Sequence, residues 1–203
     1  GVNWQAYVLH ASVFNAIITI STFFILKNFK LKTEYCFLYS LLLSILAYPS
    51  SGTPFIDHHS SFFSLLAIYS LLFAINNKRS YNWVLTPILF GLAFLSKQVP
   101  AAYIILTIGF VLLLYFFTSK KIKNIQYFLI GVFLFIITIL IFGNLQNITL
   151  SSFLDQFIFY PQTIGLSRFS NLTLSLSIVE KFFFIFISIS LLIYININNF
   201  FVV

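Results

Sequence analysis

The fold is decided by the stretch AAYIILTIGFVLLLYFFT, residues Ala101–Thr118, which no charged side chain interrupts. A run of about 20 apolar residues crosses the hydrocarbon core of a bilayer as an α-helix. Of the 203 residues of the chain, 60% are hydrophobic and 7% are charged, whereas soluble domains carry roughly 25% charged residues. Because apolar runs recur along the whole chain, a single signal peptide on a soluble domain is excluded. The sequence therefore predicts an integral membrane protein.

The apolar runs predict about seven membrane helices, and hence an all-α, polytopic helical bundle that forms a single transmembrane domain over residues 1–203. Two runs, Tyr35–Tyr48 and Trp83–Ser96, are short: about 14 residues give roughly 21 Å, against a bilayer core of about 30 Å. Irregular backbone is tolerated at membrane depth where it lines a wet cavity, so a cavity near Asp57 and Lys97 is one hypothesis. The alternative is that these helices extend beyond their apolar runs. The expected helices are Ala6–Leu26, Tyr35–Tyr48, Ser60–Ile75, Trp83–Ser96, Ala101–Thr118, Gln126–Phe142 and Lys181–Ile195.

The limits and composition of the chain indicate its source. It begins at Gly1, contains no Met and stops shortly after an apolar run, so we expect a segment of a longer protein. The single cysteine, Cys36, cannot form an internal disulfide and does not identify a redox compartment. Heavy use of Phe, Ile, Asn and Lys is typical of an AT-rich coding sequence and favours a bacterial source, in which the protein would occupy the inner membrane.

The net charge of +7 is explained by topology rather than by nucleic-acid binding. Most Lys and Arg residues fall in three clusters, each after an apolar run, and positive residues mark cytoplasmic loops. Every second loop is then cytoplasmic, which places Asp57, Lys97 and the segment 143–180 together on the outer side. The clusters consist of Lys27, Lys30 and Lys32; of Lys78 and Arg79; and of Lys120, Lys121 and Lys123.

The outer segment 143–180 is long for a connection between membrane helices, and long loops are usually functional or disordered. Phe153, Phe157 and Tyr160 are apolar at helical spacing, and Asp155 lies between them. This pattern predicts a short helix that lies on the membrane surface with its apolar face in the interface. Pro161 is expected to end it.

Asp57, His58 and His59 form the most informative polar cluster, because titratable groups at a membrane boundary are a functional hypothesis by default. Asp57 is also a preferred helix N-cap. The two histidines could be interfacial polar residues or metal ligands. Adjacent residues do not share a helix face, and catalytic zinc needs about three protein ligands, so hydrogen bonding to a polar ligand is favoured over a metal. His10, alone in the first helix, is interpreted as a satisfied core residue.

Lys97 and Gln98 form a second cluster, in a turn outside the three basic clusters. Lys97 either snorkels to the interface or binds an anion such as phosphate. Arg168 could clamp a phosphate bidentately or pair with lipid headgroups. The convergence of these residues on one side is more informative than any one of them.

Three stretches resemble the GT-C superfamily of membrane glycosyltransferases, especially bacterial members of the protein O-mannosyltransferase-like group. They are SGTPFIDHHSSFF (Ser51–Phe63), GLAFLSKQVPAAY (Gly91–Tyr103) and FLDQFIFYP (Phe153–Pro161). Such enzymes use a sugar linked to a polyprenyl phosphate and transfer it on the outer face to a lipid, glycan or protein.

The resemblance implies roles for the clustered residues. Asp57, His58 and His59 match an outer loop that lines the donor and acceptor site, and they are the candidate catalytic residues. Lys97 matches a position that approaches the lipid phosphate. The family's principal acidic base is expected upstream of Gly1. The remaining candidate substrate-binding residues are Gln98, Asp155, Tyr160 and Arg168.

Chemistry fits these roles, since a cation stabilises the phosphate that leaves and a carboxylate or imidazole takes the acceptor's proton. No nucleophile is evident, so a single displacement with inversion is expected. A divalent metal remains open as a cofactor. Two other classes also remain: a transporter, flippase or polymerase of lipid-linked glycans, and a non-catalytic membrane scaffold. The sugar, the acceptor and the oligomeric state do not follow from the sequence.

Overall fold

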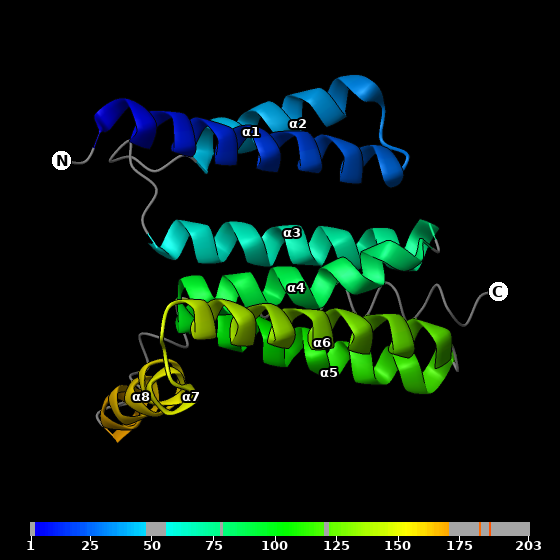
Figure 1. Cartoon of the computed structure of the whole chain (residues 1–203). Helices are drawn as coiled ribbons and strands as arrows, with labels where there is room; N and C mark the ends of the chain where they lie inside the picture. The colour runs from blue at the N-terminus through cyan, green and yellow to red at the C-terminus, as the bar shows by residue number, and fades with distance from the viewer. Residues whose placement is uncertain are drawn as a thin grey trace. The chain divides into compact units, whose positions relative to one another are not determined.

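The computed structural model describes residues 3–47, 56–77, 79–119, 122–170, 183 and 187, and every regular element in these ranges is helical (Figure 1). The predicted all-α class is therefore confirmed. In chain order the helices are α1 (Trp4–Asn28), α2 (Thr33–Leu46), α3 (Ile56–Asn77), α4 (Ser80–Ser96), α5 (Gln98–Ser119), α6 (Ile122–Leu145), α7 (Leu150–Leu154), the π-helical turn η1 (Asp155–Phe159) and α8 (Tyr160–Ser170).

The chain divides into two compact units, Gly1–Ile158 and Phe159–Val203. The first unit contains α1 to α7 and most of η1, and the second contains α8. The account of packing and of the candidate site below concerns the first unit.

Six of the expected membrane helices are present as α1 to α6, and four of them are long and apolar enough to cross a membrane: α1, α3, α5 and α6. The two short runs form short helices, of 14 residues in α2 and 17 in α4. Helix α4 begins at Ser80, earlier than the apolar run indicated, and ends at Ser96 as expected. The seventh expected helix, Lys181–Ile195, lies outside the described residues except for 183 and 187.

Helix α4 occupies the centre of the first unit, because it packs along α3 on one side and α6 on the other (Figure 1). Two glycines allow the close approach to α6. A Cβ atom at Gly131 would collide with the backbone oxygen of Val84, and one at Gly91 would collide with the ring of Phe135. Small residues at such crossings are typical of membrane helices, where close van der Waals packing drives association.

Helix α1 is joined to its neighbours by polar contacts. The Asn15 side-chain amide donates to the backbone oxygen and the hydroxyl of Ser44 in α2, each at 3.1 Å. The hydroxyls of Thr22 and Tyr69 hydrogen-bond at 2.9 Å and tie α1 to α3. These bonds attach α1 to α2 and α3. Apolar contact alone provides little driving force for helix association in a membrane, because lipid tails are as apolar as the side chains.

The distribution of side chains is that of a membrane bundle. Ser60, Ser64 and Thr86 are fully buried, whereas Leu106 and Phe117 are more than two-thirds exposed. In water such an arrangement would leave large apolar patches exposed. In a bilayer the same apolar surface would face lipid, so this distribution of buried and exposed side chains is the one expected of a protein inserted in a membrane.

One expectation about the outer segment is wrong. Pro161 does not end a helix, because it is the second residue of α8. Helical residues run without a break from Leu150 through η1 into α8, so Pro161 removes one backbone hydrogen bond from a helix that continues past it. The widened turn η1, which directly precedes α8, begins at Asp155. Helix formation between Phe153 and Tyr160 is confirmed; its position on the outer membrane surface stays a prediction.

Candidate functional site

Asp57 and Lys97 meet in an ion pair. Asp57 lies in the first turn of α3, and Lys97 is the C-cap residue that directly follows α4. Because α3 and α4 are neighbours in both sequence and space, the start of one lies beside the end of the other. The side chains are 57% and 43% exposed, respectively, so a ligand can reach both charges. We call this end of the helices the Asp57 end.

Backbone contacts hold Lys97 in place. Its N–H donates to the carbonyl oxygen of Ala93 at 3.1 Å, and its carbonyl oxygen accepts the hydroxyl of Ser60 at 3.2 Å. Ser60 is fully buried, so this bond fixes the corner between α4 and α5 against the first turn of α3. Gln98 follows directly as the first residue of α5 and is half-buried.

The ion pair of Asp57 and Lys97 contributes little to the stability of the fold and can be replaced by contacts to a ligand. Solvent-exposed ion pairs contribute at most about 1 kcal/mol to folding. An arriving phosphate can therefore compete with the Asp57 carboxylate for the Lys97 ammonium at little cost. The released carboxylate is then free to accept a hydrogen bond or a proton.

His59 faces α1, where it contacts two aromatic rings. Its ring centroid lies 5.0 Å from that of His10 and 4.9 Å from that of Phe14. The rings of His10 and Phe14 are 4.7 Å apart, so the three rings form one cluster. We call it the ring cluster; aromatic pairs at these separations attract each other.

The interpretation of His10 as a core residue is wrong, because its side chain is exposed. Helix α1 lies at the edge of the unit and buries a stripe that includes Ala11, Ile18 and Ile25. His10 lies beside this stripe. Sequence reasoning missed its contact with His59 since the pairing of α1 with α3 does not follow from either run.

The two neighbouring histidines, His58 and His59, lie in the first turn of α3. Both residues are half-buried, and successive residues of a helix point in different directions. In the part of the chain that the structure describes, no group of three His, Cys, Asp or Glu side chains is placed to hold a metal ion.

The other expected site residues lie further along the chain. Asp155 is exposed in η1, and among the described contacts none joins it to Asp57 or Lys97. Tyr160, which is exposed, and Arg168 both lie in α8, within the second unit. That these three residues reach the same ligand as Lys97 stays a prediction.

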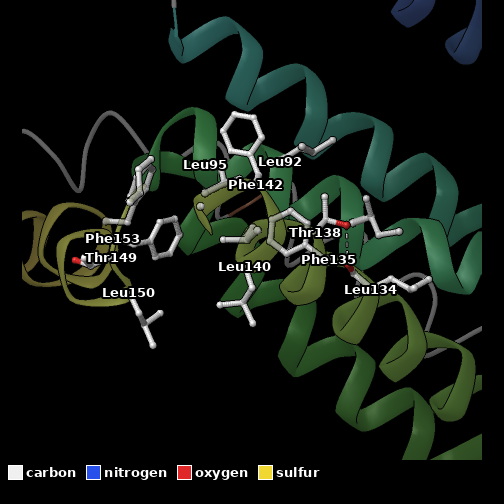
Figure 2. A pocket seen from close by; sticks show the side chains of 15 residues that line it. Leu92, Leu95, Leu134, Phe135, Thr138, Leu140, Phe142, Thr149, Leu150 and Phe153 are labelled. Atoms are coloured by element: carbon white, nitrogen blue, oxygen red, sulfur yellow. Dashed lines mark hydrogen bonds between the residues drawn. The ribbon is translucent and has the colours of Figure 1, made fainter. Parts of the chain in front are cut away.

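An apolar pocket of about 400 Å³ lies between α4, α6 and α7 (Figure 2). Leu92 and Leu95 of α4 line one side, and Phe142 of α6 and Phe153 of α7 line the others. Leu95 is two residues before Lys97, so the pocket and the ion pair share one end of α4. The sequence did not predict this pocket, since it depends on how α7 folds back beside α6.

A family model described as dolichyl-phosphate-mannose-protein mannosyltransferase matches residues 1–142. The matched range includes the ion pair, His10 and both other histidines. No curated protein and no solved structure matches the chain.

Proposed function

Since the chain belongs to the dolichyl-phosphate-mannose-protein mannosyltransferase family, and so is a membrane glycosyltransferase of the GT-C type, we propose that it uses a polyprenyl-phosphate sugar as donor. The acceptor is a hydroxyl or amine of a lipid, glycan or protein. Transfer takes place on the outer face of a bacterial inner membrane. The single observation that carries this proposal is the accessible ion pair of Asp57 and Lys97.

Lys97 holds the donor phosphate. As the bond between the sugar's anomeric carbon and the phosphate oxygen breaks, the electron pair stays on the polyprenyl phosphate. A cation that is already positioned there stabilises the growing negative charge. The helix corner that Ser60 fixes keeps the Lys97 backbone in one position.

Asp57, His58 and His59 serve the acceptor. The acceptor oxygen or nitrogen forms the new bond to the anomeric carbon from the opposite face and loses a proton to one of these groups. The result is a single displacement with inversion. Gln98, Asp155, Tyr160 and Arg168 are proposed to bind the sugar and the phosphate oxygens.

The apolar pocket between α4, α6 and α7 receives the prenyl chain. Its lining is almost wholly aliphatic and aromatic, and burial of apolar surface is the main attraction that a prenyl chain can offer. Leu95 lies at the end of α4 that also carries Lys97. A lipid phosphate on Lys97 would therefore have its chain next to the pocket.

A divalent metal is a secondary proposal. No three of the described side chains are placed to hold an ion by themselves, so Asp57 or one of the two histidines would bind it together with oxygens of the donor phosphate. Chelation of the purified protein followed by addition of Mg²⁺ or Mn²⁺ tests it: transfer that falls with the chelator and returns with the ion supports the metal.

Transfer itself is tested with the full-length protein in liposomes, given a hydroxyl acceptor and a polyprenyl-phosphate sugar labelled in the sugar. The proposal predicts that label moves to the acceptor while polyprenyl phosphate is released. A transporter would move the intact labelled lipid across the bilayer, and a scaffold would do neither. Either of these results contradicts the proposal.

The face of the membrane is tested by cysteine labelling with an impermeant maleimide. Ser61→Cys lies beside the site and Lys123→Cys lies in the first turn of α6; both positions are exposed. In a background without other reactive thiols, the outer reagent should label position 61 and not position 123. Equal labelling would exclude the proposed orientation.

A further inference from the structure

A second pocket, of about 610 Å³, lies between α1, α3 and α4, toward the end of α3 and the start of α4. Asn77, the last residue of α3, and Arg79, which precedes α4, both line it. It is therefore at the opposite end of these helices from Asp57 and Lys97. We call this the Arg79 end.

The rim of this pocket is cationic. Arg79 and Tyr81 are both exposed, and the Arg79 guanidinium donates to the Tyr81 hydroxyl at 3.1 Å. A guanidinium has five N–H donors in a planar fork, so most of them remain available for a second acceptor. No Asp or Glu occurs among the described residues that line the pocket. An anion at the rim would meet no opposing carboxylate there.

The interior of the pocket is mostly apolar. Its walls are Phe24 of α1, Leu66 and Phe73 of α3, and Leu85 and Leu89 of α4. Two of the polar side chains that line it have partners: Tyr69 bonds to Thr22, and Ser70 donates to the backbone oxygen of Asn82. A cavity with a cationic rim and apolar walls fits a molecule with an anionic head and a hydrocarbon chain.

We propose that this pocket binds an anionic phospholipid, with the lipid phosphate on Arg79 and Tyr81 and an acyl chain along Phe24, Leu66 and Leu85. Charge complementarity favours this occupant over a zwitterionic lipid. The position of the pocket also favours an anionic lipid. It lies at the end of the helices where the basic clusters lie, and basic residues next to membrane helices attract anionic lipids. The bound lipid spans α1, α3 and α4 and holds the edge helix α1 in place.

This site is independent of sugar transfer, because the donor phosphate is proposed to bind at the other end of the same helices. The lipid would instead stabilise the folded bundle, as any ligand that binds only the native state does. Loss of the lipid should therefore reduce thermal stability without a direct effect on the chemistry.

Native mass spectrometry of the purified full-length protein tests the proposal with added phosphatidylglycerol or phosphatidylcholine. Both lipids carry the phosphodiester that Arg79 would bind, but only phosphatidylcholine also carries a cationic ammonium group, which the cationic rim repels. Wild-type protein should therefore retain about tenfold more phosphatidylglycerol than phosphatidylcholine. Arg79→Gln should lose this preference, and Arg79→Lys should keep part of it. Lys123→Gln, which removes a charge at the same end outside the pocket, should behave as wild type.

Three results would overturn the proposal. The first is equal retention of the two lipids by the wild-type protein, which needs no variant to fold. The second is a wild-type preference in Arg79→Gln. The third is binding of inorganic phosphate alone with the same dependence on Arg79, because the site would then recognise a free anion and not a lipid.

Discussion

Asp57 in the first turn of α3 is paired with Lys97, the C-cap residue that directly follows α4. The pair joins the start of α3, which also carries His58 and His59, to the corner between α4 and α5, which also carries Gln98. Because both side chains are about half exposed, their role is better explained by ligand binding than by a contribution to folding.

The bond from Ser60 to the Lys97 carbonyl should matter for catalysis through position. Ser60→Ala removes the buried hydroxyl that fixes the corner between α4 and α5, and the partly buried Lys97 carbonyl loses this partner. We expect a loss of about 0.5–1.5 kcal/mol in the free energy of unfolding and weaker donor binding, seen as a higher KM. The matched control is Ser61→Ala, at the exposed neighbouring position. Equal effects of the two substitutions would contradict this role.

The crossing of α4 and α6 should tolerate no added methyl group at Gly131. A Cβ there would collide with the Val84 backbone oxygen and lie 2.7 Å from Pro87 Cγ. Gly131→Ala is therefore expected to lower the melting temperature, since the backbone of α4 must move. Nothing lies within 4 Å of a Cβ at Gly109, so Gly109→Ala is the matched control. It should leave stability unchanged or raise it, because alanine favours helix; a similar loss in both would argue against this crossing.

The ring cluster predicts that His10 acts by packing against His59. His10→Phe keeps an aromatic ring beside His59 and Phe14, so transfer should stay within about twofold of wild type. His10→Ala removes two ring contacts, each worth roughly 0.5–1.5 kcal/mol of packing energy, so it should lower the free energy of unfolding and, because His59 is held less firmly, the rate of transfer. Loss of activity in His10→Phe as large as in His10→Ala would show that the imidazole nitrogens, and not the ring packing, are needed.

Much of the fold follows from the apolar runs, because six of them became α1 to α6 with boundaries close to those expected. Only part of the candidate site could be predicted from the sequence. Asp57 and Lys97 were expected near each other since both flank the ends of short helices on one side. The contact of His10 with His59, and the pocket beside Leu95, were not expected. Both depend on which helices pack together, and uniformly apolar helices give little sequence signal for their neighbours. The expectation for Pro161 was wrong because proline usually ends a helix, whereas here the chain is helical on both sides of it.

The central claim is that Lys97 binds the donor phosphate while Asp57 lies beside it, and the rate of sugar transfer in variants tests it most directly. In the full-length protein, Lys97→Ala should reduce transfer from a polyprenyl-phosphate sugar by about 100-fold, and Asp57→Asn by at least about tenfold. Lys123→Ala, which removes a lysine from the opposite end of the bundle, should transfer at the wild-type rate, and all three proteins should unfold at similar temperatures. Wild-type transfer rates in both Lys97→Ala and Asp57→Asn would contradict the account.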